Sequence, residues 1–482
     1  MGRTFFLLAA TVSLFVLACS PTEVSGVDAI EADLGWDGGL IDGDWEGSDA
    51  GLDLADGADD AGAVAPVAVD RLLLDNEIVE RLNFEISPNQ RWATLNERPR
   101  GSRALSPVLY EIQVTGELRR VCAYPEASLR TNASMQFGEA DGQSFAVGLR
   151  ADGAALIVIR PDPDPDPDPD CPSLIEEVPL RGLPEDVPPT ELLNPYPVRG
   201  FDGRAWVALH RHAPSLDLES VYVQELAGQE DIHLAWTDTR PNRFRGFGTF
   251  ATVARWFTGE ARFIAGRWRE GSIQVFETTL SETGAATTRQ LTMNPGNKAD
   301  AFPFRTSGGV YILTNDGGGP DGLLYEEDEQ GAFVPALAIP FDASQSAIAG
   351  TPSSALSFET FVWGDQLYAS YQIADVEDRA PECRGVNCTW NELWIAAFSQ
   401  DEQGRIDGLR SRCRVSAATS DPRFRSKVDP EPAVVEGALY IFHQRSDLTR
   451  MPGNPGNQLA VIEIHNRVAF DRACARGTAA PD

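Results

Sequence analysis

The sequence predicts an all-β protein folded as a β-propeller, with seven blades as the main expectation and six as the alternative. The first observation is a unit that recurs about every 58 residues: a polar turn, an aromatic or large apolar residue, and a polar side chain four residues later. The second is a series of short strand-like segments separated by tight turns. A repeat of this length in β-rich segments is typical of propeller blades.

The seven units end on polar residues that we expect near one mouth of the propeller, where they form what we call the polar ring. Because side chains alternate along a strand, each ring residue lies on the same side as the large residue four positions earlier. One interpretation is a ring that binds a ligand, and the other is a set of side chains that satisfy backbone groups at strand ends. The ring residues are Asn96, Arg160, His210, Arg267, Asn315, Gln372 and Gln444.

Loops of uneven length follow the predicted second strands. They include the alternating Pro-Asp segment 161–170, whose prolines cannot extend a strand ladder. If each blade has alternating strand directions, these loops gather on one rim. A loop-rich rim is the usual place for binding residues on a rigid scaffold. We therefore expect the rim to bind another protein or a polymer of the cell envelope.

The first residues indicate export. Arg3 precedes about a dozen apolar residues, too few to span a bilayer of roughly 30 Å, so residues 1–18 are predicted to be a signal peptide. The segment ending at Cys19 resembles the bacterial lipoprotein signal, which implies a lipid on Cys19 and, with Ser20 next, delivery to the outer membrane. An ordinary signal peptide with an incidental cysteine is the alternative.

Six cysteines remain once Cys19 is acylated, enough for three disulfides in an oxidising compartment. Six cysteines allow 15 pairings. The pairings we favour are Cys122 with Cys171, Cys383 with Cys388, and Cys413 with Cys474.

The net charge disfavours nucleic acid as a partner. The composition of the N-terminal region indicates a tether. The chain has 40 Lys and Arg against 72 Asp and Glu, a net charge of −32, which disfavours nucleic acid. Residues 19–69 are rich in Gly, Ala and Asp and have too little apolar bulk to form a core, so we expect a disordered linker. Residues 70–482 are predicted to be the propeller, which we expect to be monomeric.

One unit carries the motif of a known repeat. It reads Arg289-Gln290-Leu291-Thr292, then Asp300-Ala301-Phe302-Pro303, then Leu324-Tyr325-Glu326-Glu327-Asp328. This order resembles the TolB-type propeller repeat. The resemblance implies the propeller architecture and does not imply an activity.

The chemistry remains open at this point. His210 and His212 lie on one side of a strand, but no other histidine adds a ligand spacing, so we expect no metal and no cofactor. Asp300 and the Asp429-Pro430-Glu431-Pro432 segment resemble the blade-starting carboxylates of arabinanase-type glycosidases. The main hypothesis is a non-catalytic binding module without catalytic residues. The alternative is a glycan-acting hydrolase that uses Asp and Glu in a central funnel.

Overall fold

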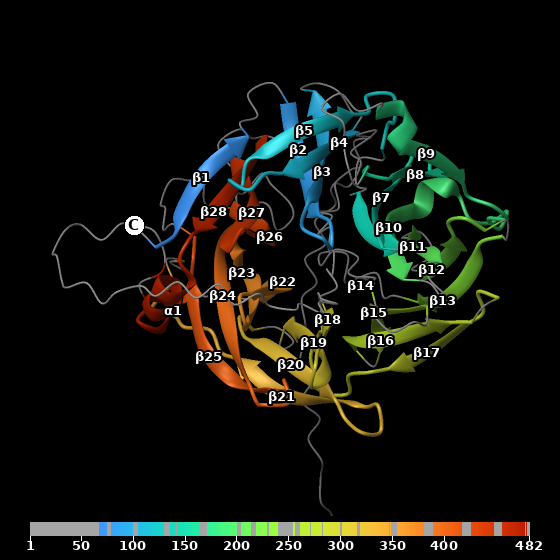
Figure 1. The fold of residues 1–482 in the computed structure, drawn as a ribbon. Helices are drawn as coiled ribbons and strands as arrows, with labels where there is room; N and C mark the ends of the chain where they lie inside the picture. Colours follow the sequence, from blue (N-terminus) through green and yellow to red (C-terminus); the bar gives the residue numbers. More distant parts are fainter. Residues whose placement is uncertain are drawn as a thin grey trace, which may run out of the picture. The chain divides into compact units, whose positions relative to one another are not determined.

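Seven four-stranded antiparallel sheets follow one another along the chain, and Figure 1 shows them as the blades of a propeller. The computed structural model describes residues 67–74, 79–99, 105–129, 135–140, 142–162, 171–199, 204–213, 218–228, 231–239, 254–255, 261–269, 271–281, 283–298, 301–315, 319–346, 348, 354–379, 389–416, 426–447, 456–477 and 479. All of them belong to one compact unit, Glu31–Asp482. The predicted fold class and the seven-blade count are confirmed.

The first three blades each use four consecutive strands. Blade 1 is β2 (Val79–Ile86), β3 (Trp92–Pro99), β4 (Ser106–Ile112) and β5 (Leu118–Ala123). Blade 2 is β6 (Gln136–Ala140), β7 (Gln143–Leu149), β8 (Ala155–Ile159) and β9 (Ile175–Pro179), with the 3-10 helix η1 (Cys171–Leu174) before β9. Blade 3 is β10 (Leu192–Arg199), β11 (Ala205–Ala213), β12 (Leu218–Glu225) and β13 (His233–Thr239), after the 3-10 helix η2 (Pro189–Glu191).

The next three blades repeat this order. Blade 4 is β14 (Ala254–Arg255), β15 (Ala261–Arg269), β16 (Ser272–Leu280) and β17 (Ala286–Gln290). Blade 5 is β18 (Phe302–Thr306), β19 (Gly309–Asn315), β20 (Gly322–Glu327) and β21 (Phe333–Ile339). Blade 6 is β22 (Ser354–Trp363), β23 (Gln366–Arg379), β24 (Thr389–Gln400) and β25 (Ile406–Arg414).

Blade 7 closes the ring with strands from both parts of the chain. Its first three strands are β26 (Ser426–Val435), β27 (Ala438–Asp447) and β28 (Gly456–Ile464), and its outer strand is β1 (Val69–Leu74). β1 pairs antiparallel with β28, so that Asp70 lies opposite Ile462. Residues near the start of the propeller are therefore part of the last sheet, which joins the two ends of the repeat.

The first strand of each blade lies nearest the centre. First strands of neighbouring blades contact each other all round the ring, from β2 and β6 to β26 and β2. The apolar cores lie between adjacent sheets, because each sheet has an apolar face toward each neighbour. Between blades 7 and 1, for example, the rings of Phe84 and Phe442 are 5.0 Å apart.

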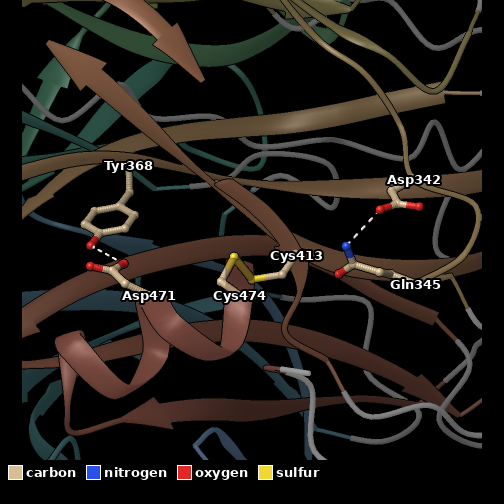
Figure 2. The surroundings of a disulfide bond; sticks show 6 residues. All are labelled: Asp342, Gln345, Tyr368, Cys413, Asp471 and Cys474. Carbon is tan, nitrogen blue, oxygen red and sulfur yellow. Dashed lines mark hydrogen bonds between the residues drawn. A yellow bond between two sulfur atoms is a disulfide. The ribbon is translucent and has the colours of Figure 1, made fainter. Parts of the chain in front are cut away.

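Helix α1 (Arg467–Ala475) packs on blade 6 and is held there by a cross-link. Asn466 caps the helix by accepting a hydrogen bond from the Ala469 amide. Figure 2 shows the disulfide from Cys474 to Cys413 of β25 and the hydrogen bond from the Tyr368 hydroxyl to Asp471, 2.8 Å long. Among the described residues no helix is long and apolar enough to cross a membrane.

Two of the three predicted disulfides are confirmed. Cys413–Cys474 joins β25 to α1, and Cys122–Cys171 joins β5 of blade 1 to η1 of blade 2. Cys383 and Cys388 lie outside the described residues, as do Cys19 and residues 1–66. The signal peptide, the lipid and most of the linker thus stay predictions.

Blade 2 corrects the predicted frame of the repeat. The segment ending at Arg160 was expected to be a second strand, but it is β8, the third strand of its sheet. The second strand is β7, in which Phe145 takes the aromatic position and Leu149 the polar one. The 161–170 segment therefore joins a third strand to a fourth. The error arose because Asp152-Gly153 and the apolar run after it imitate the turn and strand of the other units.

Candidate functional site

Six of the seven polar-ring residues are buried. Asn96, His210, Arg267, Asn315, Gln372 and Gln444 are at most 5 % exposed, whereas Arg160, which is not at the equivalent position, is exposed. Four of the six lie opposite a first-strand residue that directly precedes a bulge. These pairs are Asn96 with Leu82, His210 with Leu193, Gln372 with Leu356, and Gln444 with Val428.

Several ring side chains bind groups of the protein itself. Arg267 donates two hydrogen bonds to Asp238, of 2.7 and 2.9 Å, and its guanidinium lies over the rings of Trp236 and Phe276. Gln372 and Gln444 both contact Asp429. One of these contacts is to a backbone group, the Asp429 amide, and the others join side chains. The role of the ring stays a prediction.

The first strands of three blades share the same distortion where they lie opposite polar-ring residues. In β2, β22 and β26 the pairing register skips two residues, between Leu82 and Glu85, between Leu356 and Glu359, and between Val428 and Glu431. The first skipped residue has a left-handed backbone in each case: Asn83 (φ 53°), Ser357 (φ 54°) and Asp429 (φ 60°). Such a conformation costs energy for a non-glycine residue, and costly backbone geometry concentrates at functional sites.

A glutamate follows each left-handed residue by two positions, and the three blades concerned are consecutive around the ring. This places four carboxyl groups together, which we call the carboxylate junction: Glu85, Glu359, Asp429 and Glu431. They are 0 %, 6 %, 6 % and 4 % exposed. Buried carboxyl groups that raise one another's pKa favour proton uptake by one of them.

Glu85 takes up that proton. Burial raises the pKa of its carboxyl well above the usual value, and the negative charges of Glu431, Asp429 and Glu359 raise it further. A hydrogen bond from Gln136 acts in the opposite direction. The Glu85 carboxyl therefore keeps its proton to higher pH than an ordinary glutamate does.

Asp429 is fixed by two blades. Its backbone amide donates to Gln372 Oε1 of blade 6, at 3.2 Å, and Gln444 Nε2 of blade 7 donates to its Oδ2, at 2.9 Å. Two residues of the predicted polar ring therefore hold a member of the carboxylate junction in its left-handed conformation. The ring and the junction therefore meet at Gln372, Gln444 and Asp429.

Only some of the residues predicted from the sequence belong to the carboxylate junction. Asp429 and Glu431, singled out as one segment, belong to the junction, and Asp300 lies outside the described residues. His210 is buried, and the side chain of His212 is not described. In the described part of the chain no group of three His, Cys, Asp or Glu side chains is arranged to hold a metal ion.

Sequence reasoning missed Glu85 and Glu359. A signal was present, because the three first strands read Leu-Asn-Phe-Glu, Leu-Ser-Phe-Glu and Val-Asp-Pro-Glu at the same place in the unit. The aromatic residue of the second strand recurs more regularly than the glutamate of the first strand, so the first strand gave no prediction.

No known protein family matches the sequence, and no curated protein matches it. Solved structures with a similar fold include an oligogalacturonate lyase in complex with manganese, 10 % identical, covering 84 % of this chain and 98 % of its own with a TM-score of 0.42. An ancestral GH74 enzyme is 12 % identical and covers 80 % of this chain and 48 % of its own, with a TM-score of 0.47. The oligogalacturonate lyase of Vibrio parahaemolyticus is 9 % identical and covers 81 % and 92 %, with a TM-score of 0.42. Likenesses this distant do not carry an activity over to this chain.

Proposed function

We propose that the protein is a glycan-acting hydrolase of propeller fold in which Glu85 is the general acid. The observation that carries the proposal is the carboxylate junction, where one carboxyl holds its proton beside three others. Glycoside hydrolysis commonly uses two carboxyls with opposite tasks, one protonated and one ionised. Neighbouring like charges in a buried place produce that division between chemically identical groups.

The roles follow from the protonation states. Glu85 gives its proton to the glycosidic oxygen as the bond from that oxygen to the anomeric carbon breaks. A water molecule adds to the anomeric carbon and releases a proton to an ionised carboxylate, for which we choose Glu431, the carboxylate with the largest effect on Glu85. Since Glu85 is fully buried, the proposal requires that substrate binding uncovers this carboxyl.

The test compares two glutamates of blade 1. Glu85→Gln keeps the size of the side chain and removes the transferable proton. We expect the release of sugars from a panel of arabinan, xyloglucan and polygalacturonate to fall at least about 100-fold. Glu111→Gln is the matched control, because Glu111 pairs with Arg119 (2.6 Å) outside the junction, and this variant should keep the parent rate.

Two results would reject the hydrolase. One is a parent protein that releases no sugar from any polysaccharide tested. The other is a Glu85→Gln variant as active as the parent, since the acid would then be another group.

A non-catalytic binding module of the cell envelope is the second candidate. The complete burial of Glu85 favours it, because a group with no exposed surface does not touch a ligand in this conformation. This function predicts retention of a protein or glycan on the immobilised domain without any released sugar. Glu85→Gln would then leave the retention unchanged.

The site of action that we propose is the outer membrane. The two disulfides support a compartment outside the cytoplasm. Acylated Cys19 would anchor the chain, and residues 19–69 would space the propeller from the lipid. We expect Cys19→Ser to move the protein from the detergent phase to the soluble fraction, and unchanged partitioning would refute the anchor.

A further inference from the structure

We propose that Gln136 is a positioning residue for Glu85: it engages one carboxyl oxygen, Oε1, and so directs the acidic proton to the other, Oε2. The inference rests on the proposed function in taking Glu85 as the proton donor. Gln136 lies at the start of β6 in blade 2, and Glu85 lies in β2 of blade 1. Both side chains are 0 % exposed.

The hydrogen bond between them has a direction. Gln136 Nε2 donates to Glu85 Oε1 across 2.7 Å. An amide N–H only donates, so the oxygen it meets has to accept. In a protonated carboxyl the accepting oxygen is the carbonyl one, and the proton is on the other oxygen. The contact therefore makes Oε2 the hydroxyl of Glu85.

The Glu85 Oε2 atom can still form a hydrogen bond. It is buried and has no hydrogen-bond partner within the described part of the chain. Thr94, which pairs with Glu85 in the sheet, also has a buried hydroxyl without a partner there. Buried polar atoms are nearly always paired, so two neighbouring exceptions indicate a place where water or a substrate oxygen completes the set.

The bulge and the glutamine act together on the carboxyl. The left-handed Asn83 rotates the strand so that Glu85 pairs with Thr94 after a two-residue skip. Gln136 then fixes the rotation of the carboxyl group from the neighbouring blade. The other groups that act on Glu85 are Glu431 and Asp429 of β26 and Glu359 of β22, and all three are acceptors when ionised. Among these groups, Gln136 is the one that donates.

The experiment is infrared difference spectroscopy of the full chain at neutral pH. The carbonyl stretch of a protonated carboxyl lies apart from that of a carboxylate, and subtraction of the Glu85→Gln spectrum identifies the Glu85 band. Gln136→Met removes the donor at similar side-chain length. We expect the Glu85 band to move to higher frequency, because the carbonyl loses its hydrogen bond.

A second glutamine–glutamate pair supplies the control. Gln113 Nε2 donates to Glu111 Oε2 at 2.9 Å, in a partly exposed place away from the junction. Gln113→Met should leave the Glu85 band where it is. If Gln136→Met does not fold, Gln136→Asn keeps an amide on a shorter side chain, which lengthens the bond, and should shift the band in the same direction.

The outcomes separate this inference from the proposed function. A parent spectrum without a Glu85 band means an ionised carboxyl, and both proposals fail. A band that is present but unmoved by either Gln136 substitution overturns the positioning role alone and leaves Glu85 as an acid. A shift confined to the Gln136 variants supports the assignment of the proton to Oε2.

Discussion

Blade 7 contributes to two groups of ionisable side chains, one made of acids alone and one that combines an acid with bases. One is the carboxylate junction, to which blade 7 gives Asp429 and Glu431. The other, which we call the Asp70 cluster, consists of Asp70, Lys427, His443 and Arg445. Consecutive residues of a strand point to opposite faces. Gln444 therefore faces Asp429, while His443 and Arg445 face the other way.

The Asp70 cluster combines opposite charges. Asp70 Oδ1 lies 2.6 Å from the Arg445 guanidinium and 3.3 Å from His443 Nε2, and its Oδ2 lies 3.9 Å from Lys427 Nζ. Burial alone would raise the pKa of Asp70, but the hydrogen bond to His443 and the charges of Arg445 and Lys427 outweigh it and lower that pKa. Burial lowers the pKa of Lys427 to about 8.

The comparison shows that burial does not decide what a carboxyl does. Asp70 and Glu85 are both buried, yet the pKa of Asp70 is lowered and that of Glu85 is raised. The neighbours make the difference: cations stabilise the ionised form, and other carboxylates destabilise it. The cations of the Asp70 cluster stabilise the ionised Asp70 of the closing strand β1, whereas the carboxylates of the junction favour the protonated form of Glu85.

The largest effect is expected at Asp70. Asp70→Asn removes a buried carboxylate that lies beside Lys427 and Arg445, and loss of one partner of a buried ion pair costs about 3–5 kcal/mol. The free energy of unfolding from guanidinium titration should fall by that amount near neutral pH. Because the pKa of Asp70 is lowered, its contribution is present above the ordinary value of 3.8 and is lost as the pH falls below it.

Parent and variant should therefore converge in acid. A loss of stability below about 1 kcal/mol at neutral pH, the size usual for exposed pairs, would contradict the structural role given to the Asp70 cluster.

The fold was accessible from sequence because its unit is local. Turn, aromatic residue and polar residue fall within one hairpin, and this pattern marks six of the seven blades at the right place. The partner of β1 was not accessible, because Asp70 and Ile462 are far apart in the chain and nothing in their patterns links them. The Arg160 misassignment has a different, local cause, since two hairpins of blade 2 carry similar turns.

The site was accessible only in part. Asp429 and Glu431 were singled out as a local segment, but the junction forms across the closure of the ring, where blades 6, 7 and 1 meet. The distance in sequence between Glu85 and Glu431 hides that contact. The raised pKa of Glu85 depends on burial and on the other three carboxyls, and neither can be read from one strand.

The second prediction concerns the pH dependence of stability at Glu85. A raised pKa favours the protonated form in the folded state, so the stability that Glu85 contributes declines as the pH rises above the ordinary value of 4.5. Glu85→Gln, always neutral, should remove this decline and be more stable than the parent at pH 7.

At Glu111 the pKa shifts in the opposite direction, so the pH dependence of stability has the opposite sign. Although burial raises the pKa of Glu111, the hydrogen bonds from Arg119 and Gln113 and the charges of Arg119 and Arg91 lower it overall. Glu111→Gln should therefore be less stable than the parent above pH 4.5. Equal pH profiles for Glu85→Gln and the parent would show that the junction does not hold its proton.

The smallest effect is expected at the exposed side of β1. Arg71, next to Asp70, lies 3.1 Å from Glu117, whose side chain is 59 % exposed. Glu117→Gln should cost less than about 1 kcal/mol, because water and salt screen an exposed pair. Asp70→Asn and Glu117→Gln each neutralise one carboxylate: Asp70 lies on β1, and Glu117 pairs with Arg71 of β1. Comparing the guanidinium unfolding of the two variants therefore isolates the contribution of burial. If Glu117→Gln proved as costly as Asp70→Asn, the docking of β1 as a whole, and not the buried charges, would hold the ring closed.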